Sequence, residues 1–206
     1  VPLGPLTTYR VGGPAARFAL GEDEADLQRV AAAAARSGVE VLVVGKGSNL
    51  LVADAGFAGL ALQLGPAFAE VVVSGSTVRA GGAASLPVVA RRSAAAGLTG
   101  FEWAVGVPGS IGGAVRMNAG GHGSDLAASL VRVRVVDLAD GEDGEVDTTD
   151  LHLAYRSSAV ASTQVVVWAE LDLAPGSVSE AEAEIAEIVR RRRANQPGGQ
   201  NAGSVF

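Results

Sequence analysis

The sequence contains no cysteine and only two histidines, His122 and His152. Disulfide bonds, thiolate metal sites and a cysteine nucleophile are therefore excluded, as is a zinc or iron site built from several histidines. We accordingly expect no metal. Aromatic residues are also few, at 4%, whereas hydrophobic residues make up 48% of the 206 residues. A chain of this length and composition can bury a core without disulfide or metal crosslinks.

The chain also lacks an excess of positive charge and a long apolar run. Its formal net charge is −6, and an acidic protein is a poor nucleic-acid binder because phosphate neutralisation supplies most of that affinity. Four consecutive arginines, at residues 190–193, are the local exception. No apolar run approaches the roughly 18 residues of a membrane span, and no basic segment typical of a signal peptide opens the chain. We therefore expect a cytoplasmic protein without nucleic-acid binding or membrane insertion.

Helices and strands are predicted along the chain without a strict βαβ order, which favours an α+β fold. The helix predicted at residues 23–38 has an apolar stripe of helical period, acidic residues in its first turn and Gly38 at its end. Further helices are expected at residues 86–96 and 179–193. Short apolar or alternating runs predict the strands, at residues 39–44, 50–53, 60–64, 71–73, 77–80, 131–137 and 165–173.

The last predicted helix has a recognisable start and an apolar face. Ser179 and Glu182 have the spacing of a capping box, and residues 197–199 are expected to end the helix. Its buried face is expected to consist of five apolar residues, namely Ala183, Ile185, Ala186, Ile188 and Val189. The chain then stops at residues 203–206, directly after a loop and on apolar side chains. This ending is typical of a shortened chain.

A first glycine motif, Gly45-Lys46-Gly47, follows the predicted strand at residues 39–44. A Rossmann dinucleotide site needs a third glycine three residues further on, followed by a helix. Leu50 stands at that position, and a strand is predicted after it. The spacing of a phosphate-binding P-loop is absent as well. From this motif alone, a tight turn between two strands is as good an interpretation as a ligand site.

A second loop, residues 106–114, contains four glycines, Gly106, Gly109, Gly112 and Gly113. Glycine allows the backbone to approach a ligand closely, and successive backbone N–H groups in such a loop can form an anion-binding nest. The two loops also carry polar side chains that could act as donors, those of Ser48, Asn49 and Ser110. Together they indicate a bound dinucleotide outside the Rossmann class; the alternative is two loops that only pack tightly.

Several motifs occur in an order that identifies a family resemblance. They lie at residues 8–15, 43–52, 100–103, 106–114, 117–120, 155–158 and 203–206. Together they closely resemble the UDP-N-acetylenolpyruvoylglucosamine reductases, the MurB flavoenzymes of peptidoglycan precursor synthesis. Each motif alone is weak, but the resemblance extends over nearly the whole chain.

The resemblance implies an FAD-binding domain of the vanillyl-alcohol-oxidase/p-cresol-methylhydroxylase type. FAD would lie, without a covalent bond, between two α+β subdomains at residues 1–64 and 65–176, and residues 177–206 would begin a third, substrate-binding domain. NADPH would be the hydride donor and the substrate a small molecule, a UDP sugar. We also expect a monomer. The expected cofactor-binding residues are those of the two glycine loops, namely Gly45, Lys46, Gly47, Ser48, Asn49, Leu50, Gly106, Val107, Pro108, Gly109, Ser110, Gly112 and Gly113.

The resemblance also implies catalytic and substrate-binding residues. Reduced flavin would give a hydride to the enolpyruvyl group of the UDP sugar, yielding UDP-N-acetylmuramate. Arg156 matches the family arginine that stabilises the negative charge left on the substrate, and Ser204 matches the serine that donates a proton. Arg192 or Arg193 would contact the substrate, or else belong to a solvated charge run. Tyr155 would line the substrate pocket or pack in the core, and packing is the favoured interpretation.

One departure from the family bears on activity. The family carries a catalytic glutamate near the C-terminus of its third domain, and nothing in these 206 residues matches it. We therefore expect residues 1–206 alone to bind FAD without turning over substrate, and to expose the stripe of Ile185, Ile188 and Val189 where the third domain docks. Two alternatives are another FAD-dependent oxidase of the same superfamily and a non-catalytic flavin-binding module.

Overall fold

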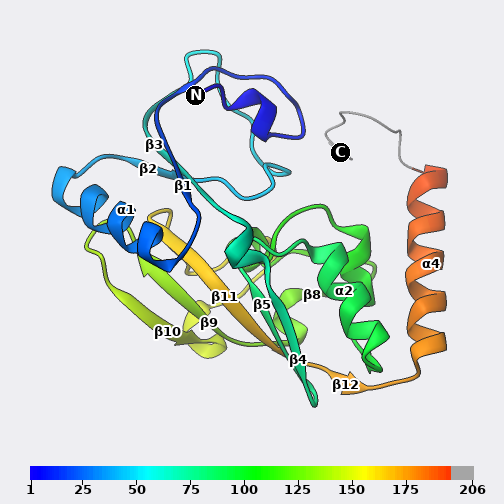
Figure 1. Ribbon diagram of the computed structural model, residues 1–206. Coiled ribbons are helices and arrows are strands. Elements are labelled where there is room, and N and C mark those ends of the chain that lie inside the picture. Colours follow the sequence, from blue (N-terminus) through cyan, green and yellow to red (C-terminus); the bar gives the residue numbers. More distant parts are fainter. Residues whose placement is uncertain (196–206) are drawn as a thin grey trace.

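The computed structural model describes residues 1–195, which contain a three-stranded and a five-stranded sheet (Figure 1). The first sheet is parallel and has the order β1 (Ala15–Gly21), β3 (Phe57–Leu64), β2 (Val41–Val43). Helix α1 (Glu24–Ser37) connects β1 to β2 and packs against β1. This unit connects two parallel strands of one sheet through a helix, with β3 lying between β1 and β2. The helix and β2 are predicted from the sequence, but β1 is not.

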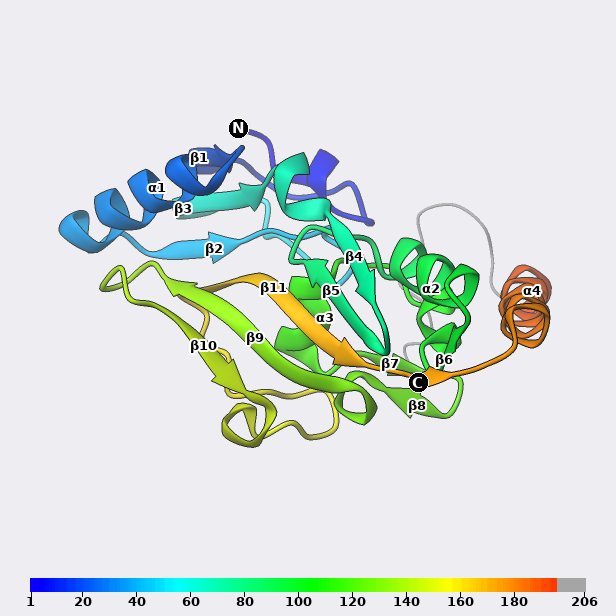
Figure 2. The same ribbon diagram turned by 60° about the horizontal axis from the view of Figure 1, so that its bottom comes forward.

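The second sheet is antiparallel throughout. Its order is β10 (Asp143–Asp147), β9 (Leu130–Asp137), β11 (Gln164–Asp172), β5 (Thr77–Gly81), β4 (Val71–Ser74). Strands β4 and β5, both predicted from the sequence, pair as a hairpin. Figure 2 shows the three-stranded sheet and α1 lying over the β9–β10–β11 side of this sheet, with α2 and α4 at the other side of the molecule.

The remaining helices cover the second sheet and its edge. Helix α3 (Ile111–Met117) packs against β11, and α4 (Val178–Asn195) packs against α2 (Leu86–Ala95). The short strands are β6 (Leu98–Thr99), β7 (Gly120–Gly121), β8 (Ser124–Asp125) and β12 (Ala174–Pro175). The 3-10 helices are η1 (Gly4–Leu6), η2 (Pro66–Ala69), η3 (Glu102–Gly106), η4 (Leu126–Ala128) and η5 (Thr148–Leu151).

The two sheets share a hydrophobic core. Leu27 of α1 and Leu62 of β3 are fully buried, and they belong to one cluster with Val136 of β9 and Val165 and Val167 of β11. Burying large aliphatic side chains in this way contributes about 1.5–3 kcal/mol each. The packing therefore fixes the first sheet against the second.

Polar contacts reinforce the same junction at its surface. The guanidinium of Arg134 on β9 forms ion pairs with Glu24 on α1, at 2.9 Å, and with Asp143 on β10, at 2.7 Å. The hydrogen bond from Arg134 and the ion pair hold the pKa of Asp143 below its ordinary value, against a smaller opposing effect of burial. Gln28 on α1 also donates to the Asp143 carboxylate, at 3.0 Å.

Sequence signals at both ends of α1 are confirmed. The Asp23 carboxylate accepts a hydrogen bond from the Asp26 backbone N–H at 2.8 Å, which satisfies a free donor of the first turn. Gly38 ends the helix in the left-handed conformation, with φ 60°. The strands predicted at residues 39–44, 60–64, 71–73, 77–80, 131–137 and 165–173 and the helix at 86–96 are also present, with shifts of a few residues at their ends.

The strand predicted at residues 50–53 is wrong. This segment runs without secondary structure beside the N-terminal loop, where the Gly13 N–H donates to the Ala53 carbonyl at 2.9 Å. Leu50 and Val52 are apolar because they pack on a small cluster around Leu3, and not because they enter a sheet. Leu51 points away from that cluster and is 74% exposed.

The predicted start of the last helix is wrong by two residues. The Oγ of Ser177 accepts from the Glu180 backbone N–H at 3.4 Å, so Ser177 caps the helix and Ser179 lies in its first turn. The buried face of α4 is also narrower than predicted, because Ala183 and Ala186 are exposed. The stripe of Ile185, Ile188 and Val189 is not exposed: Ile185 and Ile188 are buried, and Val189 is partly buried, against the core that contains α2 and η3.

Candidate functional site

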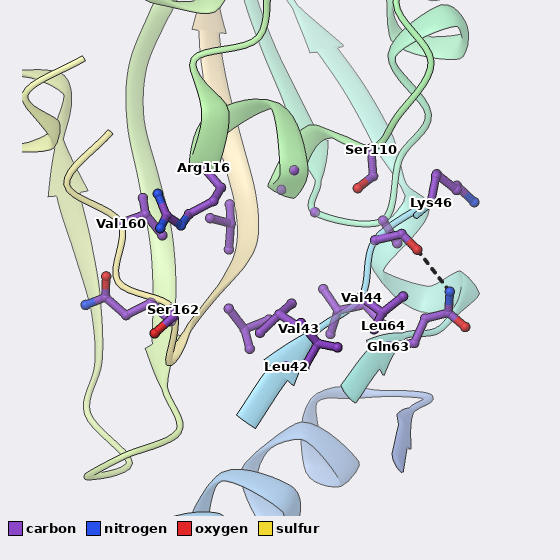
Figure 3. Close-up of a pocket in the computed structure, with 18 of the residues that line it drawn as sticks. Leu42, Val43, Val44, Lys46, Gln63, Leu64, Ser110, Arg116, Val160 and Ser162 are labelled. Atoms are coloured by element: carbon purple, nitrogen blue, oxygen red, sulfur yellow. Dashed lines mark hydrogen bonds between the residues drawn. The ribbon is translucent and has the colours of Figure 1, made fainter. Parts of the chain in front are cut away.

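A cavity of about 330 Å³ lies between the two sheets (Figure 3). One wall is β2 and the start of the loop that follows it, residues 41–46. The opposite wall is formed by the start of β11, at Gln164 to Val166, and by Gly112 and Gly113 of α3. The segment from Val160 to Ser162 lies at one end. Each sheet thus contributes a wall.

The lining combines apolar walls with a few polar groups. Strand residues such as Val43 and Val166 supply the apolar surface, and Gln63, Gln164, Ser110 and Ser162 supply uncharged polar groups. The two charged lining residues are cations, Lys46 and Arg116, and no carboxylate is found among the described residues of the lining. Figure 3 shows Lys46 and Arg116 on different sides of the cavity. This combination suits a ligand that has apolar ring surface and negative charge.

The two glycine loops meet at the edge of this cavity. The Oγ of Ser48 donates to the Pro108 carbonyl at 3.0 Å. A Cβ built on Gly45 would lie 2.6 Å from the Ser110 Oγ, and one on Gly109 would lie 3.3 Å from the Ser48 Oγ. Gly109 also has φ 144°, a conformation that residues with side chains rarely adopt. Side chains at Gly45 and Gly109 would therefore push the loops apart.

Hydrogen bonds from β3 and from the N-terminal segment anchor the first glycine loop. Gln63 on β3 donates its side-chain N–H to the Gly45 carbonyl at 3.0 Å (Figure 3). The Thr8 backbone N–H donates to the Gly47 carbonyl at 3.1 Å. Gly47 has φ 63°, and a Cβ there would lie 2.0 Å from the Leu6 carbonyl oxygen. The N-terminal segment thus braces the loop that faces the cavity.

The second loop differs from the predicted all-loop nest, because α3 begins at Ile111 within it. The Ile111 backbone N–H donates to the Ala84 carbonyl, and the Gly112 N–H donates to the Gly82 carbonyl, each at 2.9 Å. These two amides are thus not free to bind an anion. Gly112 serves close packing instead, since a Cβ there would lie 3.2 Å from the Gly82 carbonyl oxygen.

The structure separates the predicted cofactor-binding residues into two groups. One group lines the cavity and consists of Gly45, Lys46, Leu50, Ser110, Gly112 and Gly113. The other group belongs to the same loops but does not line the cavity, and consists of Gly47, Ser48, Asn49, Gly106, Val107, Pro108 and Gly109.

Sequence reasoning missed other lining residues, chiefly Gln63, Gly82, Ala83, Arg116 and Gln164. Gly81-Gly82, between a predicted strand and a predicted helix, was an available signal for a close backbone approach. A Cβ on Gly82 would lie 1.9 Å from the Val166 carbonyl oxygen. The other positions have no local signal, because the fold alone brings them together.

Arg156 lies outside the cavity, at the tip of a tight turn. Ala154 and Ser157 exchange backbone hydrogen bonds of 3.0 and 3.1 Å across this turn. Arg156 has φ 55°, and its Nη2 donates to the Gly120 carbonyl at 3.1 Å. Its guanidinium carbon lies 5.3 Å from the ring centre of Tyr155. The favoured interpretation of Tyr155 as a packed residue is wrong, because its side chain is 87% exposed.

The other predicted catalytic and substrate residues lie at or beyond the end of α4. Arg192 donates from Nη1 to the Gly106 carbonyl, which ties α4 to the start of the second glycine loop. Arg193 is exposed. Ser204 lies outside the described residues, as do residues 197–199. His122 has φ 54° and its ring lies against Gly106, where a Cβ would come within 2.5 Å of Nε2.

Residues 1–195 contain neither a membrane-spanning helix nor a metal-binding cluster of side chains. No helix in this range is long and apolar enough to cross a membrane. No group of three or more His, Asp or Glu side chains in the same range could hold a metal ion.

A family model described as "FAD binding domain" matches residues 15–146. The chain is also similar to curated UDP-N-acetylenolpyruvoylglucosamine reductases. It is 42% identical over 210 residues to that of Acidiphilium cryptum, with 100% of this chain and 66% of the relative covered. It is 40% identical over 208 residues to that of Caulobacter vibrioides, with 99% and 68% covered. The chain thus spans about two thirds of the length of these relatives.

Solved structures agree with these relatives. The UDP-N-acetylenolpyruvylglucosamine reductase (MurB) from Thermus caldophilus superposes with a TM-score of 0.86 at 32% identity, with 100% of this chain and 73% of that one covered. 6-Hydroxy-D-nicotine oxidase from Arthrobacter nicotinovorans gives a TM-score of 0.56 at 19% identity, with 82% and 38% covered, and so shares the fold alone. The predicted α+β, FAD-binding fold class is confirmed. The chain belongs to the UDP-N-acetylenolpyruvoylglucosamine reductase family and carries its FAD-binding domain.

Proposed function

We propose that the chain is the flavin-binding part of an enzyme that reduces UDP-N-acetylenolpyruvoylglucosamine to UDP-N-acetylmuramate with NADPH. The observation that carries the proposal is the cavity between the sheets, bordered by two glycine loops that touch through Ser48 and Pro108. The substrate is the one for which the similar reductases are named. The second candidate, an oxidase of the same superfamily, has only low-identity likeness of fold to support it.

The cavity residues fit a flavin dinucleotide. Apolar walls at Val43 and Val166 suit an aromatic ring system, and Lys46 and Arg116 supply positive charge for a diphosphate. Gly45 allows the two loops to approach each other closely beside the cavity, because a Cβ there would lie 2.6 Å from the Ser110 Oγ. We propose that both glycine loops, including their members outside the lining, hold FAD without a covalent bond. When bound, FAD takes a hydride from NADPH and passes it to the substrate double bond.

The proposed role of Arg156 follows from the charge that develops on the substrate. Hydride addition to the enolpyruvyl group leaves negative charge next to its carboxylate, and a fixed guanidinium would stabilise it. One donor of this kind is worth on the order of 10²–10³ in rate. Gly120 holds Arg156 through its carbonyl, and the exposed ring of Tyr155 lies beside the guanidinium. We propose that Tyr155 contacts the substrate.

The remaining roles concern the C-terminal part of the chain. Ser204 is proposed as the proton donor at the neighbouring substrate carbon. Arg192 or Arg193 is proposed to contact the substrate; of the two, Arg192 is already oriented toward Gly106. We also propose that residues 1–206 alone bind FAD but do not turn over substrate, since the resemblance places a further catalytic glutamate in a later domain.

Organisation and location complete the proposal. Subdomain boundaries at residues 64 and 176 are supported by the end of β3 at Leu64 and the end of β12 at Pro175. The absence of cysteine agrees with a reducing compartment, and we place the reaction in the cytoplasm. We expect a monomer, which light scattering after size-exclusion chromatography tests.

The test is NADPH oxidation by the FAD-loaded product of the complete gene, with and without the UDP sugar. We expect oxidation that depends on the sugar and yields UDP-N-acetylmuramate. Residues 1–206, purified separately, should bind FAD and give no sugar-dependent oxidation. A complete product that consumes NADPH only with oxygen, whatever the sugar concentration, would favour the oxidase candidate.

A further inference from the structure

We propose that Asn118 is a positioning residue that fixes the Arg156 turn against the FAD-binding cavity. This inference rests on the proposed function, because it gives Arg156 its role at the substrate. Asn118 is one of the few polar residues buried in the described chain, at 4% exposure. A buried amide is retained at low cost only where its donors and acceptor are paired.

Each polar atom of the Asn118 side chain has a partner. Its Nδ2 donates to the Ala154 carbonyl at 3.1 Å and to the Asp125 Oδ2 at 3.2 Å. Its Oδ1 accepts from the Ala127 backbone N–H at 3.0 Å. Ala154 is the first residue of the turn that carries Arg156, so the Asn118 amide holds this turn at its base.

Asn118 is also connected to the wall of the cavity, through helix α3. Asn118 caps the C-terminus of α3, with φ 39°, and α3 contributes Gly112, Gly113 and Arg116 to the cavity lining. A second hydrogen bond also links α3 to the segment that contains the turn, since the Ser158 Oγ donates to the Arg116 carbonyl at 2.9 Å. Helix α3 therefore joins the cavity to the Arg156 turn, with Asn118 at the junction.

The backbone of the turn indicates why it needs support. Arg156 occupies the left-handed region, at φ 55°, where glycine and asparagine are favoured. Such a conformation is strained and persists only where the surroundings determine it. Asn118 at the base of the turn and Gly120, which accepts from the guanidinium, provide those surroundings. A loosened turn would place the guanidinium less well for the charge on the substrate.

Three variants of the complete, FAD-loaded gene product separate positioning from simple stability, at about pH 8, where carboxyl groups are ionised. Asn118→Asp keeps the size of the side chain but sets a carboxylate against the Ala154 carbonyl and Asp125. Asp125→Asn, the control, leaves the Ala154 contact in place. The double variant Asn118→Asp/Asp125→Asn restores a donor–acceptor pair between positions 118 and 125, but not the bond to Ala154.

Three measurements are made on each variant: amide hydrogen exchange, stopped-flow absorbance and the melting temperature. Amide hydrogen exchange at Ala154 and Ser157 reports the turn directly. Stopped-flow absorbance reports flavin reduction by NADPH and reoxidation by the UDP sugar. We expect at least tenfold faster exchange and about tenfold slower reoxidation in Asn118→Asp and in the double variant, because about 1.4 kcal/mol of positioning is lost. Flavin reduction by NADPH should stay near wild type in all three variants. Asp125→Asn should also keep wild-type amide exchange and reoxidation. The double variant should recover the wild-type melting temperature.

Contrary outcomes are equally specific. Unchanged exchange in Asn118→Asp would overturn the proposal, as would a double variant that recovers the reoxidation rate together with the melting temperature. Faster exchange with normal reoxidation would show that the turn's position does not matter to the chemistry. A wild-type protein without sugar-dependent reoxidation would contradict the proposed function, and exchange alone would then decide whether Asn118 braces the turn.

Discussion

The Oγ of Ser48 donates a hydrogen bond to the Pro108 carbonyl at 3.0 Å, although 60 residues separate them in the sequence. This contact joins a loop of the three-stranded sheet to a loop that precedes α3. Gly45 and Ser110 face each other next to it, with no room for a Cβ on Gly45. The proposed FAD-binding site therefore depends on the close approach of two loops that are far apart in the sequence.

Gly45→Ala should weaken FAD binding about tenfold, because the new Cβ would lie 2.6 Å from the Ser110 Oγ and force the loops apart. The double variant Gly45→Ala/Ser110→Ala removes that oxygen and should recover a large part of the affinity. The measurement is flavin fluorescence titration of both variants and of Ser110→Ala. Purely additive losses would argue against contact between the two positions in solution.

Arg156→Ala in the complete gene product should lower sugar-dependent turnover by on the order of 10²–10³, while FAD binding and flavin reduction by NADPH persist. Arg156 lies outside the cavity lining, and its proposed role begins only after hydride transfer, when charge develops on the substrate. Stopped-flow separates the two half-reactions, with exposed Arg36→Ala on α1 as the control. Slow flavin reduction with normal reoxidation would place Arg156 elsewhere.

Arg134→Ala should destabilise the protein by about 1 kcal/mol near neutral pH, and by less in acid. The pKa of Asp143 is lowered by its bond to Arg134, so the pair contributes fully above the unfolded carboxyl pKa and loses its effect as pH falls through the folded value. Urea unfolding from about pH 6 to pH 3 tests this, since the difference from wild type should shrink. A difference that is constant over that range would contradict the linkage.

Ile188→Ala should cost about 2–5 kcal/mol, because this side chain is 5% exposed and packs in the same core as α2 and η3. Ala186→Ser, on the exposed side of α4, should change stability by less than about 0.5 kcal/mol. Chemical denaturation of residues 1–206 measures both. Equal, small effects would mean that α4 does not pack on this core in solution.

Local sequence signals were sufficient where interactions between residues close in the sequence determine the conformation. Asp23 and Gly38 delimit α1 because a carboxylate cap and a left-handed glycine act within a few residues. The segment at residues 50–53 looked like a strand because its apolar side chains carry no information about which partner buries them. The N-terminal loop buries them in place of a sheet.

The site could be predicted only in part for the same reason. Glycine density marked both loops correctly as neighbours of the cavity, and Gly45 and Gly113 line it. It could not show that the Ile111 and Gly112 amides are already used by carbonyls of residues 84 and 82. Nor could it find Arg116 or Asn118, whose importance arises from contacts with segments more than 30 residues away.

The most direct test of the FAD-binding site is a titration of residues 1–206 and of their Gly113→Leu variant with FAD, followed by gel filtration and visible absorbance. Gly113 lines the cavity, and a Cβ there meets only the Ser110 Oγ, at an ordinary 3.6 Å. Leucine should therefore fill the cavity without disturbing α3, and should raise the melting temperature slightly, as a better helix former. Ala33→Leu on the exposed face of α1 is the matched control. We predict one FAD per chain for wild type and control, and at least about tenfold weaker binding for Gly113→Leu. A wild-type chain that retains no flavin, or a Gly113→Leu variant that binds FAD as tightly as wild type, would contradict it.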